Sequence, residues 1–449
     1  MTTRAHSRAS GVSPSPRGVA LILVLTVIAI LTSIGVDFSY NSRVSLKLAE
    51  NARDGMRAYY LARSAVNLSR LLLHYQKQLD GAGAAVGNAL ASGAGAGLPG
   101  MPPPTGAGAA APTSLGIRLW ELVPIDSNAF GLLLSGAGAD AIGADGAVLA
   151  RDRAREGSAG PERPRDLPPP ERPLHAFGDF AGSYRTKIVD ENSRINVAKL
   201  NGISPHPLAA LIQMRAMMAD PKYDFIFNEE DAQHDRVARD DVILAMKDWI
   251  DEDETGSGID PTQTRGNPFI NAFSDENGPY SRYTPRYKVK NAKADSLEEL
   301  YQVRGVNDRF MAAFGDRLTV WPDINSPLNI NTDDPLQQAT NIIIVADNPN
   351  DPRLRDPALL TTILQAIRVR KMFSFFGLTA QDFIGVLVAN GIKVRPEFLV
   401  AGSPLNFLGE KSDTFRITAT GKVGRIERTV TAVVRYDDLL GRLLYWKEG

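Results

Sequence analysis

The chain has 449 residues, a length that indicates two or three domains rather than one. Its 50 Lys and Arg residues nearly balance 51 Asp and Glu residues, and the net charge of -1 argues against a protein that coats nucleic acid. The absence of cysteine excludes disulfides, thiolate metal sites, iron–sulfur clusters and a cysteine nucleophile.

The first segment, residues 1–18, is polar and basic and ends in Gly18. No residue from Val19 to Val36 is charged, and at ~1.5 Å per residue this run is just long enough to cross a bilayer core of ~30 Å. Basic residues before the run and Asp37 after it predict a single span with the amino end in the cytoplasm. A cleaved secretory signal is the simpler alternative, but no small-x-small cleavage site follows the run.

The next segment, residues 37–79, continues the apolar run without a helix breaker. Its apolar residues recur every three or four positions, and its basic residues lie on the other side. This pattern therefore predicts one continuous helix over residues 19–79, with a transmembrane half at 19–36 and an amphipathic periplasmic half at 37–79. An ordinary membrane anchor with a stalk is the alternative interpretation of this pattern.

Residues 80–183 are predicted to be an insertion or linker. The stretch 81–112 is rich in Gly, Ala and Pro and carries no charge, so it is expected to be flexible. Only residues 113–134 are apolar enough to predict a small ordered element.

Strands are predicted at both ends of the remaining chain. Residues 184–199 alternate and contain β-branched side chains, which predicts one or two strands with a turn at 191–193. Within the segment 411–449, residues 414–422 and 426–436 predict a hairpin with Gly424 near the turn. Residues 200–410 between them are mainly helical by pattern, with helices expected at 206–220, 239–251, 295–305, 308–315, 358–376 and 379–391. The predicted fold class is α+β, with a long N-terminal helix, a small antiparallel sheet and a large, mainly helical inserted domain.

An acidic loop follows the helix that is expected to end near residue 251. Asp251, Asp253, Thr255 and Gly256 match positions 1, 3, 5 and 6 of a calcium loop, in which oxygen ligands surround the ion. Thr262 stands at position 12 in place of a bidentate Glu, so the loop is not an EF-hand. A solvated acidic turn that caps the helix is the alternative. Residues nearby that complete this site or a second one are Asn271, Asp275, Glu276 and Asn277.

The segment 297–306 looks like one helix-hairpin-helix unit, which holds a phosphate on backbone N–H groups. Asp308 would repel a phosphate, so a packing hairpin in which Gly305 ends the helix explains the segment better. The five histidines lie far apart, and the sequence contains no GxSxG, HExxH or phosphate-cradling loop. We therefore expect neither nucleic-acid binding nor enzymatic activity.

A basic leader that ends in Gly, followed by an apolar helix that becomes amphipathic, resembles the class III signal of type IV pilins and pseudopilins. The resemblance implies that a prepilin peptidase cleaves between Gly18 and Val19 and methylates the new amino terminus, so that the helix stays in the chain. The fifth mature residue of this family is normally Glu, and here it is Leu23. In this family the Glu is expected to pair with the amino terminus of a neighbouring subunit, because an unpaired carboxylate in the membrane is costly. A subunit that lacks the Glu therefore need not dock beneath a preceding subunit.

Several stretches resemble, in the same order, the minor pseudopilin K family of type II secretion systems, which is known for lacking that Glu. They are RGVALILVL, RAYYLARSAVNL, IVDENSRINVAKL, MKDWIDEDE, DSLEELYQVRGV and LNINT. The resemblance implies a pilin-like packing of the helix on the sheet and calcium as the cofactor of the acidic loop. The residues assigned to the metal are Asp251, Asp253, Glu254, Asp260 and Asp275.

The resemblance also implies a place at the tip of the pseudopilus, where the chain helps to initiate assembly and export across the outer membrane. The expected partners are other minor pseudopilins, reached through Tyr40, Val44 and Leu48, together with the inner-membrane secretion platform, the prepilin peptidase and exported substrates. The chain is expected in the inner membrane with its body in the periplasm. The alternatives are a minor pilin of a type IV pilus, a membrane-tethered DNA receptor that uses residues 295–310, and a membrane-anchored hydrolase.

Overall fold

The computed structural model describes residues 16–91, 118–122, 125–127, 175–177, 180–230, 235–373, 378–399, 407–437 and 441–449, with side chains of the first range from 20 to 80. Most of the predicted leader and of the predicted insertion lies outside these residues. For Gly18 and Val19 only the helical backbone is described.

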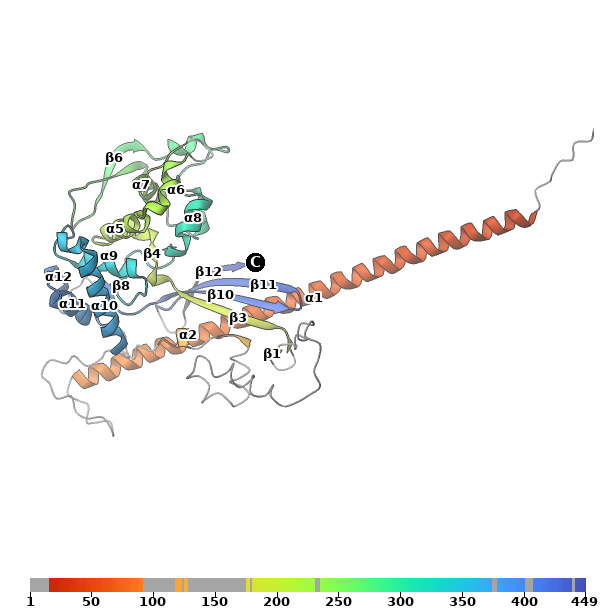
Figure 1. Ribbon diagram of the computed structural model, residues 1–449, viewed down its shortest axis with the longest axis horizontal. Helices are drawn as coiled ribbons and strands as arrows, with labels where there is room; N and C mark the ends of the chain where they lie inside the picture. Colours follow the sequence, from red (N-terminus) through yellow and green to blue (C-terminus); the bar gives the residue numbers. More distant parts are fainter. Residues whose placement is uncertain are drawn as a thin grey trace, which may run out of the picture.

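One helix, α1 (Pro16–Ala91), confirms the prediction of an unbroken helix over residues 19–79. It is about 110 Å long at ~1.5 Å per residue. It continues into the stretch that was expected to be flexible, because residues 81–91 are rich in alanine, the best helix former. Residues 20–53 are exposed throughout and extend away from the rest of the molecule (Figure 1).

The second half of α1 packs on a four-stranded antiparallel sheet in the order β12-β11-β10-β3. The predicted hairpin at 414–422 and 426–436 and the predicted strand after residue 184 are therefore confirmed. Side chains of β10 alternate between the two faces of the sheet, which is the reason its sequence shows period two. The strand bounds are β3 (Ser183–Asp190), β10 (Thr414–Val423), β11 (Ile426–Arg435) and β12 (Arg442–Glu448).

Small residues allow α1 to approach the sheet closely. Ala58, Ala62 and Ala65 are fully buried, and they lie on the same face of the helix at three- and four-residue spacing. Opposite them, a Cβ atom at Gly421 of β10 would lie only 2.1 Å from the carbonyl oxygen of Ala58. The segment RAYYLARSAVNL is therefore the packing face of the helix.

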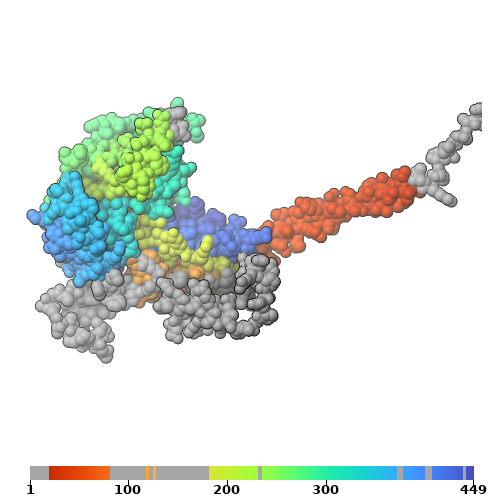
Figure 2. Space-filling model, viewed as in Figure 1, coloured from red at the N-terminus to blue at the C-terminus, as the bar shows by residue number. Residues whose placement is uncertain are grey.

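The inserted region between β3 and β10 is mainly helical, as expected, and forms a head above the sheet (Figures 1 and 2). Two apolar cores hold it together, one around α5, α7 and α8 and one around α9, α10 and α11. Its helices are α5 (His206–Met218), α6 (Asp224–Asn228), α7 (Arg239–Ile250), α8 (Asp308–Phe314), α9 (Pro335–Val345), α10 (Pro357–Phe373), α11 (Ala380–Ala389) and α12 (Pro396–Leu399).

Short elements complete the described residues. The expected helix at 295–305 is a 3-10 turn, η5 (Glu298–Gln302), and the acidic loop continues into a hairpin of β5 (Thr255–Ile259) and β6 (Phe269–Asp275). The other 3-10 turns are η1 (Glu191–Ser193), η2 (Val197–Asn201), η3 (Pro221–Tyr223), η4 (Pro279–Arg282), η6 (Gly315–Arg317) and η7 (Pro352–Arg355). The remaining elements are α2 (Leu119–Leu122), β1 (His175–Phe177), β2 (Phe180–Ala181), β4 (Ile195–Asn196), β7 (Leu318–Thr319), β8 (Leu328–Asn329) and β9 (Leu408–Gly409).

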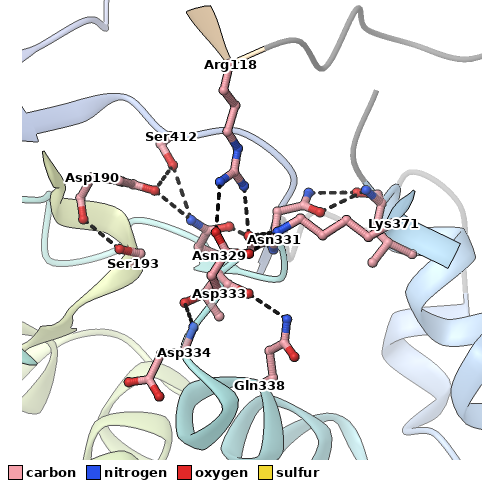
Figure 3. Close-up of polar contacts among 12 residues, drawn as sticks. Arg118, Asp190, Ser193, Asn329, Asn331, Asp333, Asp334, Gln338, Lys371 and Ser412 are labelled. Carbon is pink, nitrogen blue, oxygen red and sulfur yellow. Dashed lines mark hydrogen bonds and ion pairs between the residues drawn. The ribbon is translucent and has the colours of Figure 1, made fainter. Parts of the chain in front are cut away.

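A buried polar network joins the sheet to the head (Figure 3). Asp190, at the end of β3, accepts hydrogen bonds from Asn329 Nδ2 at 3.0 Å and from Ser412 Oγ at 2.5 Å. The side-chain amide of Asn331 donates to the backbone carbonyls of residues 378 and 410. The backbone carbonyl of Asn331 accepts from the side chains of Arg118 and Lys371. Because these residues come from separate parts of the chain, the network fixes the head relative to the sheet.

Stability of this junction should depend on pH through Asp190. Burial raises the pKa of Asp190 to about 6, while the bonds from Ser412 and the Asn192 N–H act in the opposite direction. Between about pH 4 and pH 6 the folded chain holds a proton that the unfolded chain has lost, so the free energy of unfolding should fall by up to about 3 kcal/mol as pH rises. In chemical unfolding, Asp190→Asn should lose this contribution and show a smaller slope than the wild type, because Glu276, whose pKa is also raised, still contributes in this range. Asp333→Asn, which changes an exposed carboxyl paired with Arg118, should keep the full wild-type slope.

Candidate functional site

Three carboxylates meet where α7 ends and the β5–β6 hairpin closes. Asp248 lies in the last turn of α7, Asp251 is its C-terminal cap, and Glu276 directly follows β6. Pairing of Thr255 with Asp275 brings the end of β6 back to the acidic loop. One carboxylate oxygen from each of the three lies within 4.8 Å of the others. We call Asp248, Asp251 and Glu276 the carboxylate triad.

Several oxygens of the carboxylate triad lack hydrogen-bond donors. Asp251 and Glu276 are each only 3% exposed. Neither oxygen of Glu276 accepts a hydrogen bond, and neither does Asp251 Oδ1. Asp248 Oδ1 accepts from the backbone N–H of Ser257 at 2.9 Å, and Asp251 Oδ2 accepts from Lys247. Buried carboxylate oxygens without donors are costly, and a bound cation would compensate them.

The electrostatics of the triad support the same conclusion. Burial raises the pKa of Glu276, the negative charges of Asp251, Asp248 and Asp253 add to this effect in that order, and together they bring the pKa to about 8. Burial also raises the pKa values of Asp248 and Asp251. Hard oxygen ligands and concentrated negative charge suit a divalent cation such as calcium, and three carboxylates supply part of the six to eight oxygens that it takes. The donor set of this chain therefore fits the metal that its sequence resemblance implies.

Of the metal ligands predicted from the sequence, Asp251 belongs to the triad and the other four lie outside it. Asp253 is exposed, and its carboxylate accepts a hydrogen bond from the Thr255 N–H. It contributes to the triad only through its negative charge, which raises the pKa of Glu276. Asp260 and Asp275 accept from the N–H groups of Thr262 and Asn277 in local turns. Glu254 is exposed.

The triad contains one residue that the sequence analysis did not single out and one that it named only as a neighbour. Asp248 lies three residues before Asp251, and this spacing on a helix predicts that the two share a face. Glu276 was named together with three neighbours, and only the pairing of β5 with β6 shows which of the four is buried against α7.

The residues predicted for assembly lie on the exposed half of α1. Tyr40 and Leu48 are 68% and 63% exposed, and Val44 is 38% exposed. Their spacing of four residues places them along one side of the helix. Leu23, in the apolar run, is exposed as well. Within the described residues, α1 is the one helix long and apolar enough to cross a membrane, and none of its most apolar window is buried.

The hairpin at 295–310 packs inside the head. Leu300, Val303 and Phe310 are buried, and Gly305 adopts φ +82° directly before α8. A Cβ atom at Gly305 would lie 2.8 Å from Val242 Cγ2 of α7, so the glycine permits a close approach. This geometry agrees with the interpretation of the segment as a packing hairpin.

Comparisons with protein families and with curated proteins give no match. Among solved structures, the chain is similar to a chain in the crystal structure of the GspK-GspI-GspJ complex from the type 2 secretion system of enterotoxigenic Escherichia coli. The match has a TM-score of 0.38 and 16% sequence identity, and it covers 64% of this chain and 84% of the matched chain. A likeness at this level does not extend to function or partners.

Proposed function

We propose that this chain is a minor pseudopilin of a type II secretion system, located at the tip of the pseudopilus. The observation that carries the proposal is the division of α1 into two halves. The C-terminal half packs on the sheet through buried alanines, whereas the N-terminal half, residues 20–53, is exposed and begins with an apolar run. An exposed apolar helix of this length has to be shielded from water. Before assembly a membrane would cover it, and in the assembled fibre the helices of neighbouring subunits would cover it.

The tip position rests on Leu23 and on the head. At Leu23 the chain lacks the carboxylate with which pilin-like subunits pair with a neighbour's amino terminus. The helices α10 to α12 lie near the end of α1 that is far from the apolar run (Figure 1). A subunit stacked further along the same axis would meet this head. We therefore propose that the chain ends the fibre, with other minor pseudopilins, the inner-membrane secretion platform and the prepilin peptidase as its partners.

We also propose that the carboxylate triad holds calcium in the head. The support is the burial of Asp251 and Glu276 together with their unpaired oxygens. A bound ion would tie the end of α7 to the end of β6, because the triad draws ligands from both. The proposed role is structural, since we expect no catalytic activity.

A single cysteine on α1 tests the assembly proposal, because the chain has no other cysteine. Val44→Cys, treated with a short thiol-reactive cross-linker in membranes that contain a complete secretion system, should give adducts with other minor pseudopilins. Val369→Cys is the matched control, because Val369 is a 51% exposed valine on α10 in the head. The intact mass of the purified chain should correspond to an amino terminus at Val19.

Two results would contradict the proposal. Equal adducts from Val44→Cys and Val369→Cys would show that the exposed half of α1 is not the assembly surface. Adducts of Val44→Cys with subunits of a type IV pilus, in cells that contain both systems, would assign the chain to the pilus instead.

A further inference from the structure

Lys247 is the cation that the structure places on the carboxylate triad. It lies one helical turn before Asp251 on α7, and its ammonium donates to Asp251 Oδ2. The side chains of both residues are nearly inaccessible, with 9% and 5% exposed. The positive charge of Lys247 lowers the pKa of each member of the triad, in opposition to burial.

We propose that Lys247 is an internal counter-cation, which neutralises Asp251 in the metal-free chain and has to leave Asp251 when a divalent cation engages that carboxylate fully. This inference rests on the proposed metal site. It makes Lys247 the residue that sets the affinity of the site, although Lys247 itself offers no ligand atom to a metal.

The distribution of free oxygens supports this role. Both oxygens of Glu276 and Asp251 Oδ1 accept no hydrogen bond, so a cation can make its first contacts without disturbing Lys247. Asp251 Oδ2 is occupied by the ammonium, so its use as a ligand requires the ion pair to break. Breaking a buried ion pair is costly, and this cost is subtracted from the affinity for the metal. The long, flexible lysine side chain allows the displacement.

The metal-free chain gains from the same contact. Three carboxylates within 4.8 Å of one another repel when they are ionised, and Lys247 offsets one of the three charges. Removing the ammonium should therefore destabilise the metal-free head and strengthen calcium binding at the same time. A lysine that served only the stability of the fold would produce the first effect without the second.

The test compares calcium binding to the full-length chain in detergent by titration calorimetry. Lys247→Met, which keeps the length of the side chain and removes its charge, should bind calcium at least about tenfold more tightly than the wild type. Lys247→Arg should stay near the wild-type affinity. Lys222→Met is the matched control, because Lys222 pairs with Asp220 at 2.8 Å on an exposed surface and its loss changes the net charge equally.

Thermal unfolding supplies the second measurement. Without calcium, Lys247→Met should unfold at a lower temperature than the wild type, and saturating calcium should raise its midpoint more than it raises that of the wild type. Equal or weaker calcium binding by Lys247→Met overturns the role of Lys247 alone. A variant that stays unfolded in excess calcium also counts against it, because the ion then does not replace the ammonium. Absence of calcium binding in both the wild type and Lys247→Met would instead overturn the metal site itself.

Discussion

Gly421→Ala should separate α1 from the sheet. A Cβ atom at this position would lie 2.1 Å from the carbonyl oxygen of Ala58 and 2.8 Å from the backbone nitrogen of Ala62. Both are backbone atoms of a helix, which cannot move aside as the end of a flexible side chain can. We expect the free energy of unfolding of the helix–sheet unit to fall by about 3 kcal/mol or more. Thermal unfolding of the full-length chain in detergent, followed by fluorescence of the tryptophans at this junction, measures the change.

Gly385→Ala is the matched control for this substitution. Gly385 lies within α11, and nothing is within 4 Å of the position that a Cβ atom would take. There the alanine should be neutral or stabilise the chain by up to about 1 kcal/mol, because glycine is a poor helix former. If Gly421→Ala left the unfolding transition unchanged, the close packing of α1 on β10 would be wrong.

Loss of a triad carboxylate should weaken calcium binding by about 100-fold. Glu276→Gln and Asp251→Asn preserve the shape of each side chain and remove a charge that lies beside the proposed ion, a change worth a few kcal/mol in a buried site. Titration calorimetry on the full-length chain measures the dissociation constants. In the absence of calcium, Glu276→Gln should also be more stable than the wild type near pH 8, because it removes a buried acid whose pKa is about 8.

Asp260→Asn is the control that separates the triad from the acidic loop in general. Asp260 belongs to the same acidic sequence, but its carboxylate accepts from the N–H and hydroxyl groups of Thr262. This variant should bind calcium with nearly the wild-type affinity. If it lost binding while Glu276→Gln kept it, the ion would lie in the loop, as the sequence pattern alone suggested, and not at the triad.

Local periodicity was sufficient to predict the frame of this fold. Of the apolar residues whose spacing predicted α1, Ala62, Val66 and Leu73 are buried against the sheet. The alternation that predicted β10 corresponds to Phe415, Ile417 and Ala419, which face the helix. These elements were predictable because each buries one face against one partner. The turn at Gly424, which has φ +58°, was readable for a similar reason, since glycine accepts this conformation without strain.

Elements that depend on contacts distant in the sequence were predicted less well. Residues 255–259, with two glycines, have low strand propensity, and they form β5 because β6 pairs with them and α7 packs against them. The apolar residues of 295–305 follow a helical spacing, yet only a 3-10 turn forms, and it ends at Gln302, before Gly305 is reached. At the candidate site, acidic composition predicted the region, whereas burial selected Glu276 from among its acidic neighbours.

The length of the exposed half of α1 has a mechanical consequence. Residues 20–53 extend for about 50 Å, and a bilayer core takes up ~30 Å of that length. With the apolar run in a bilayer, the part of α1 that packs on the sheet begins roughly 20 Å above the hydrocarbon core, and the head lies further along the same helix. An inclination of about 20°, common for lone spanning helices, moves a point about 80 Å along the helix sideways by nearly 30 Å. If the chain assembles as we propose, a free subunit would move its head over a wide area of the membrane and could reach distant partners, whereas packing against neighbouring helices would fix its inclination.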